Sequence, residues 1–194
     1  MGRPKKNRQR RQARKVARRT GPRSVNITQR LWLTYNTVYT STTGVALANG
    51  FTFTTATVYA SYGNFANQVT NLYNEYRVES IQLRIVPVPG VSAAGLYPTG
   101  LYLAGFEGPT APAANIAIIQ RLPNHQLRPL FDKVITYKWR RTNDPENRTF
   151  TTTAAAAPIL GGIVGYIGAG APTLGTAYMT VEASFMITAK SRLV

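Results

Sequence analysis

Apolar and polar residues alternate along several segments of the chain, a pattern typical of strands with one buried face. In the segment 31–39, alternate positions place Leu31, Leu33, Tyr35 and Tyr39 on one face. The segment 51–59 alternates in the same way, with threonines opposite its aromatic residues. The pattern is clearest over 177–190, where one side is apolar throughout: Ala177, Met179, Val181, Ala183, Phe185 and Ile187. We expect a strand over each of these segments.

Another strand, third in chain order, is expected before Pro87, but its alternation changes phase. Apolar residues occupy one phase up to Val78 and the opposite phase from Ile81 onward. This slip predicts either a β-bulge near Glu79 and Ser80 or a strand that starts only at Ser80. Further strands are expected over 101–106 and 133–141. Strands with weaker patterns are expected over 126–131 and 159–167.

Helical spacing occurs twice between these strands. After Asn64 as a possible N-cap, apolar residues follow at helical intervals: Phe65, Val69, Leu72, Tyr73 and Tyr76. A second short helix is expected over 113–121, between Pro112 and Pro123. The helices therefore fall in the second and fourth connections of an eight-strand series. This order predicts an all-β fold, an eight-stranded antiparallel sandwich or jelly roll with two short helices in connections.

Positive charge is concentrated at the beginning of the chain. The sequence has 23 Lys and Arg residues and 7 Asp and Glu residues, a formal net charge of +16. Twelve of the cations lie within the first 30 positions, and the first acidic residue is Glu75. The remaining 164 residues have 11 cations and 7 acids, a net charge of only +4. This segregation predicts a near-neutral body, residues 28–194, and a polycationic arm, residues 1–27, with a polyanionic partner.

The arm has too few apolar side chains to offset the entropy of ordering, so we expect it to be disordered when unbound. Arginine predominates, which suits bidentate contacts with phosphate. If all of its cations contacted single-stranded nucleic acid, the salt slope of binding would approach about −8, from roughly −0.7 per phosphate. The candidate nucleic-acid-binding residues are these eleven cations: Arg3, Lys5, Lys6, Arg8, Arg10, Arg11, Arg14, Lys15, Arg18, Arg19 and Arg23.

Three other interpretations of the arm compete with nucleic-acid packaging. The segment 3–11 is a plausible nuclear import signal, which is compatible with packaging. A membrane-surface helix is disfavoured because no bulky apolar face exists to insert into lipid. A purely solubilising tail does not require such a dense arginine cluster.

The body lacks the residue patterns of the common enzyme classes. Cysteine is absent and the single histidine is His125, which is the only available base for a Ser-His-acid triad. No nucleophile elbow, Walker loop or dinucleotide fingerprint occurs. We therefore expect no enzyme activity, no cofactor and no small-molecule substrate. The uncharged stretch 149–181 is interrupted by glycines and prolines, which favours strands and loops over a membrane span.

The predicted order resembles the single jelly-roll coat proteins of small icosahedral viruses, particularly the shell domain of tombusvirus-like and sobemovirus-like plus-strand RNA viruses. In that family the helices also follow the second and fourth strands. Local matches are the segments 76–87 (YRVESIQLRIVP), 100–104 (GLYLA), 137–139 (YKW) and 175–182 (GTAYMTVE). The resemblance covers about residues 28–190. It implies many copies assembling into a closed shell, with the arms pointing inward onto a single-stranded genome. As a departure from the family, we expect no protruding domain after the last strand.

The resemblance predicts that the chain is a capsid protein that packages single-stranded RNA in a virion. We expect the virion to assemble in the cytoplasm in preference to the nucleus. Two alternatives stay open: the capsid protein of a circular single-stranded DNA virus, with the arm doubling as a nuclear import signal, and a cellular basic nucleic-acid-binding protein. No membrane partner is expected.

Two minor features have alternative interpretations. Interface calcium in the family uses clustered aspartates, and this sequence has no such motif, although Asp144 and Glu146 offer carboxylates for a subunit-interface cation. The alternative is an acidic turn. Arg140 and Arg141 either contact the genome on the inner surface or pair with Asp132 or Asp144.

Overall fold

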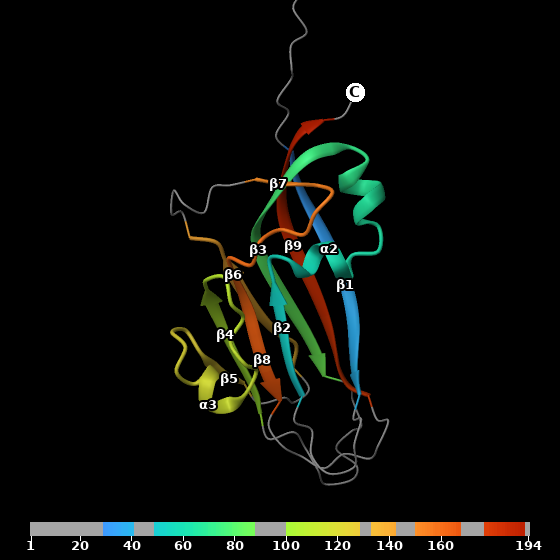
Figure 1. Cartoon of the computed structure of the whole chain (residues 1–194). Coiled ribbons are helices and arrows are strands. Elements are labelled where there is room, and N and C mark those ends of the chain that lie inside the picture. Colours follow the sequence, from blue (N-terminus) through green and yellow to red (C-terminus); the bar gives the residue numbers. More distant parts are fainter. Residues whose placement is uncertain are drawn as a thin grey trace, which may run out of the picture.

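Two antiparallel sheets face each other in the computed structural model, which describes residues 29–40, 49–87, 100–128, 133–142, 150–167 and 177–192 (Figure 1). The first sheet contains, in spatial order, β1 (Gln29–Thr40), β9 (Ala177–Arg192), β3 (Tyr73–Pro87) and β6 (Ile135–Arg140), and β7 (Thr151–Thr152) pairs with β3. The second contains, in spatial order, β2 (Asn49–Thr54), β8 (Gly161–Ile167), β4 (Leu101–Glu107) and β5 (Gln126–Arg128).

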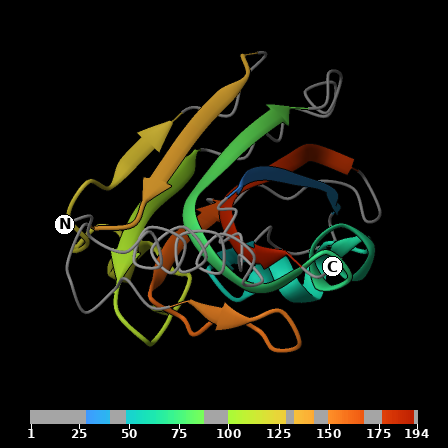
Figure 2. The same cartoon turned by 90° about the horizontal axis from the view of Figure 1, so that it is seen from above.

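Neighbouring strands in both sheets are distant in sequence, and all described pairs are antiparallel. The last strand, β9, lies between β1 and β3, while β8 lies between β2 and β4. Seen from above, β1, β9 and β3 lie side by side, with β6 beyond β3 (Figure 2). This interleaving is the order of a jelly roll, so the predicted fold class is confirmed. The two-residue strand β7 was not predicted.

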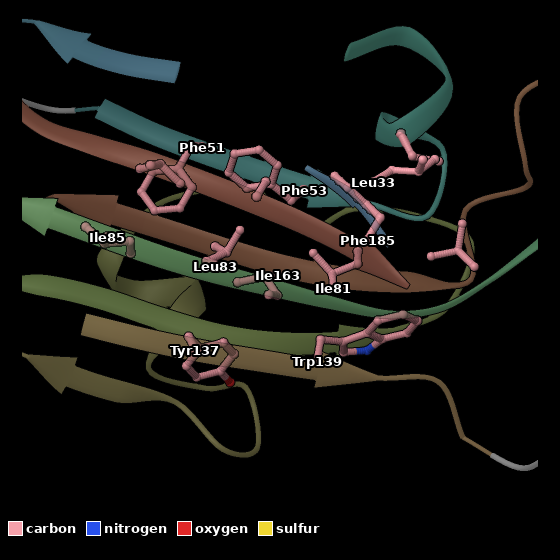
Figure 3. Close-up of a cluster of buried hydrophobic side chains, with 14 of the residues drawn as sticks. Leu33, Phe51, Phe53, Ile81, Leu83, Ile85, Tyr137, Trp139, Ile163 and Phe185 are labelled. Atoms are coloured by element: carbon pink, nitrogen blue, oxygen red, sulfur yellow. The ribbon is translucent and has the colours of Figure 1, made fainter. Parts of the chain in front are cut away.

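The core lies between the sheets and is built from the faces that the alternation predicted (Figure 3). Leu33 of β1, Phe53 of β2 and Phe185 of β9 are each at most 2% exposed. On β9 every second residue from Met179 to Ala189 is buried, as the apolar phase requires. Apolar burial on this scale is the main stabilising contribution to the fold.

The phase slip in the strand predicted before Pro87, which is β3, is a β-bulge. The pairing of β3 with β9 changes from Val78 opposite Ile187 to Ser80 opposite Met186, which leaves Glu79 as the extra residue. The strand already begins at Tyr73, so the alternative of a start at Ser80 is wrong.

The side chain of Glu79 secures this bulge. Its Oε1 atom accepts hydrogen bonds from Nε of Arg77 and from Oγ1 of Thr188, both at 2.8 Å. The cost of breaking the ladder is therefore offset by polar contacts made by the extra residue itself.

The strand predicted over 51–59 is wrong beyond Thr54. A short helix, α2 (Thr57–Ser61), follows, and it contains Tyr59. The hydroxyl of Thr57 accepts a hydrogen bond from the backbone N–H of Thr54 at 2.9 Å. This local bond favours a turn over continued alternation.

The first predicted helix is shorter than its spacing suggested. It is a π-helical turn, η1 (Ala66–Thr70), preceded by Phe65 at the N-cap position without a side-chain capping bond. Asn64 is therefore not the N-cap, although its backbone carbonyl accepts a bond from the N–H of Gln68. Tyr73 and Tyr76 belong to β3, because pairing with β9 determines their conformation.

The second predicted helix is confirmed as α3 (Ile116–Ile119), within 113–121. Oδ1 of Asn115 caps it by accepting from the N–H of Ile118 at 3.0 Å. Ile119 packs on the outward side of the second sheet against Ala104, Phe106 and Val164. Part of the outward face of that sheet is therefore covered by α3. Among the described residues, no helix has the length and hydropathy needed to cross a bilayer.

Candidate nucleic-acid interface

The eleven predicted nucleic-acid-binding cations, Arg3 to Arg23, lie outside the described residues. The first described position is Gln29, the start of β1. The arm therefore joins the body at one end of the first sheet, next to the twelfth early cation, Arg30.

The outward face of the first sheet carries most of the charged side chains of the described body. On β1 the side chains of Arg30, Trp32 and Thr34 are exposed, while Leu33 points into the core. On β6 exposed and buried residues also alternate, and the exposed ones are Thr136, Lys138 and Arg140. Strand period 2 places these residues on one surface.

Three of the cations on this sheet are paired with acids. Arg84 lies 3.3 Å from Glu182, and Lys190 lies 3.3 Å from Glu75, in each case between nitrogen and carboxylate oxygen. Arg77 contacts Glu79 at 2.6 Å beside the bulge. The charge of these parts of the face is locally neutral.

The remaining cations of the face have no acidic partner among the described residues. Arg30, Lys138 and Arg140 are exposed, and none lies within ion-pair distance of a described carboxylate. The Nζ atom of Lys138 lies 5.8 Å from the ring centroid of Trp32, a cation–π distance. We call these four residues, Arg30, Trp32, Lys138 and Arg140, the basic face.

Arg141 differs from its neighbour Arg140 because it is partly buried. Burial, reinforced by repulsion from Arg77, lowers the pKa of its guanidinium, while Glu79 and Glu107 oppose that change. Its backbone N–H donates to the carbonyl of Glu79 at 3.0 Å. Arg141 therefore belongs to the bulge region. The predicted alternative partners, Asp132 and Asp144, lie outside the described residues.

A cleft of about 650 Å³ opens between the edges of the two sheets, at β5 and β6. Several of its polar groups are paired with one another, whereas Lys138 and Arg140 of the basic face also line it. Nε1 of Trp139 donates to Glu107 at 3.0 Å, and the hydroxyl of Tyr137 accepts from the N–H of Gly105 and donates to the carbonyl of Asn124. Desolvation raises the pKa of Glu107 and of Tyr137. These bonds tie the two sheets together.

His125 is exposed, and its Nδ1 lies 3.1 Å from the backbone carbonyl oxygen of Leu122. No described contact brings a serine or a carboxylate to this ring. In the part of the chain that the structure describes, no group of three or more potential metal ligands occurs. Asp144 and Glu146 lie outside that part.

Sequence reasoning missed Trp32 as a candidate binding residue. The signal was present, because Trp32 stands in the solvent-facing phase between Arg30 and Thr34. The proximity of Lys138, which is more than one hundred residues away, depends on the sheet order β1-β9-β3-β6.

No protein-family model matches the sequence, and no curated protein sequence matches it. Solved structures are similar in fold. Cocksfoot mottle virus has a TM-score of 0.60 at 7% identity, with 90% of this chain and 91% of that chain covered. Mud crab tombus-like virus has a TM-score of 0.55 at 12% identity, with 94% and 98% covered. The 60-mer BFDV capsid protein has a TM-score of 0.52 at 11% identity, with 87% and 97% covered. The resemblance to viral jelly-roll coat proteins is confirmed at the level of the fold.

Proposed function

We propose that this chain is a structural viral coat protein that assembles into an icosahedral shell and packages single-stranded RNA through residues 1–27. The observation that carries the proposal is the separation of roles along the chain. A near-neutral jelly-roll body follows a segment with eleven cations and no acid. A dense cationic segment binds phosphate with little dependence on sequence, which suits the packaging of a long genome.

Assembly of many copies is supported by the fold and by exposed apolar side chains at the sheet edge. One structure of similar fold is a 60-mer capsid protein. In this chain Leu127 of β5 is 55% exposed and Val134, next to β6, is 48% exposed. Burial of such side chains between symmetric copies would favour association. Many arms binding one polymer would reinforce closure of the shell.

RNA is favoured over DNA because the overall resemblance is to plus-strand RNA viruses, and one structure of similar fold is from a tombus-like virus. The proposed location is the virion, with assembly in the host cytoplasm. The competing function is the capsid protein of a circular single-stranded DNA virus, for which the segment 3–11 would act in nuclear import.

Electron microscopy of the purified full-length protein with its bound nucleic acid tests this proposal. We expect closed isometric particles whose nucleic acid, once extracted, is degraded by RNase and resists DNase. Degradation by DNase alone would favour the DNA-virus alternative. Protein that stays monomeric with nucleic acid at moderate ionic strength would contradict a coat function.

A further inference from the structure

We propose that the basic face is a second, folded contact for single-stranded RNA, in which a base stacks on Trp32 while Lys138, Arg30 and Arg140 contact phosphates. This inference rests on the proposed packaging function and adds to the arm a site on the body itself. Its chemistry is an aromatic platform surrounded by cations, the arrangement by which single strands are held without sequence preference.

Trp32 is the first part of the argument. It is 54% exposed on β1, between the outward-facing Arg30 and Thr34. A single exposed apolar residue is common on protein surfaces and by itself indicates nothing. Here the indole ring lies beneath a lysine ammonium group, 5.8 Å from it, so a base stacked on the ring would place its phosphate near a cation.

The distribution of charge is the second part. Each carboxylate on this sheet that the structure describes is already paired: Glu75, Glu79 and Glu182. Three cations of the basic face are left over, so the surface complements a polyanion. A second copy that presented the same face would place like charges against one another, which makes it a poorer occupant.

The width of the surface is the third part. Trp32 pairs in register with Met186, which pairs with Ser80, which pairs with Arg140. The row crosses three strand spacings, about 14 Å at roughly 4.8 Å each. Ser80 is fully buried although it has the outward phase, so longer neighbouring side chains close over it. The row thus forms a continuous strip that can hold more than one nucleotide.

The fourth part is the position of the arm. Residues 1–27 enter the body at β1, and Arg30 and Trp32 are the first two outward-facing residues of the basic face. RNA that is bound by the arm is therefore held at this face at high effective concentration.

The experiment measures binding of a fluorescein-labelled short oligouridylate to the full-length chain over a series of salt concentrations, below the protein concentration of assembly. We expect W32A to weaken binding about five- to hundredfold, the range for loss of one base–aromatic stack, with an unchanged salt slope. W32F should retain most of the affinity. The double variant K138Q/R140Q should instead reduce the slope by about 1.4, at roughly 0.7 per phosphate.

The control is L72A, which removes an exposed apolar side chain (39% exposed) that does not belong to the basic face and should leave RNA binding unchanged. Intrinsic fluorescence gives a second readout, because Trp32 is exposed whereas Trp139 is 5% exposed. RNA should quench the wild-type fluorescence and should not quench W32F. A merely structural role of Trp32 would not produce this difference.

The outcomes separate this inference from the proposed function. Wild-type affinity in W32A, with no quenching of the wild type and a steep salt slope, would overturn the basic face and leave the arm as the RNA-binding element. A wild-type chain that does not bind the oligouridylate would contradict both. A change of Trp32 fluorescence on assembly without RNA would show that a second copy covers the face, and would also overturn the inference.

Discussion

Tyr76 joins two parts of the body through its hydroxyl group. The side chain is fully buried and packs edge-on against Phe65, with ring centroids 5.0 Å apart. Its hydroxyl group donates to the carbonyl of Ala155 at 3.0 Å and accepts from the N–H of Ala157 at 2.7 Å. Burial raises the pKa of this phenol to about 12, so the group stays neutral throughout the physiological range. One side chain thus fixes the segment that leads into β8.

Replacing Tyr76 with Phe should destabilise the body by about 1–3 kcal/mol, because the buried N–H of Ala157 loses its acceptor without gaining water. Urea unfolding followed by circular dichroism measures the change.

Tyr59→Phe is the matched control for this substitution. The hydroxyl of Tyr59 donates to the carbonyl of Ala154 at 3.1 Å, and the residue is 38% exposed, so the free energy of unfolding should change by less than about 0.5 kcal/mol. Equal effects of the two substitutions would show that the hydroxyl of Tyr76 has no special role.

Strand β8 has a weak sequence pattern because glycines interrupt it, and its close pairing with β2 explains one of these glycines. Thr54 of β2 pairs with Gly162. A Cβ atom built on Gly162 would lie 2.1 Å from the backbone oxygen of Phe53, so no larger residue fits without moving a strand. The glycines that weakened the strand prediction over 159–167 are therefore compatible with close pairing of β2 and β8.

Gly162→Ala should destabilise the body by about 1–3 kcal/mol or more, since the added methyl group meets backbone atoms that cannot rotate away. The matched control is Gly63→Ala, where a Cβ would meet no atom within 4 Å. Comparison of the two urea midpoints checks the prediction. A midpoint for the Gly162 variant equal to that of the Gly63 variant would mean that the close contact relaxes without cost.

Most strands could be predicted because burial of one face imposes period 2 on the sequence, and the bulge at Glu79 could be predicted because it shifts that period. Two errors arose where other contacts determine the backbone. The hydroxyl of Thr57 ends β2 early, and pairing with β9 places Tyr73 and Tyr76 in a strand despite their helical spacing. The local pattern of apolar and polar residues contains no information about the Thr57 hydrogen bond or about the pairing with β9.

The candidate site was harder to predict than the fold because it depends on distant pairs. Trp32 is identifiable from the sequence as an outward residue, but the sequence does not show that Lys138 reaches its ring. Arg84 and Glu182 are 98 positions apart, so their ion pair could not be predicted from the sequence either. Which cations stay unpaired, and therefore where a polyanion can bind, follows only from the sheet order.

At the scale of the whole molecule, the proposed function divides the chain into a body that forms the shell and an arm that holds the genome. The described body contains its own complete jelly-roll sheets and core, and no described strand begins before Gln29. Stability of the body should therefore be independent of the arm, whereas binding of a long polyanion should depend on it strongly.

The most direct test measures the nuclease-protected RNA in particles formed by a chain lacking residues 1–23, alongside its thermal unfolding. We predict that the truncated chain unfolds like the full-length protein and forms empty or smaller shells without full-length RNA. A truncated chain that is unfolded, or one that still protects full-length RNA, would contradict the account.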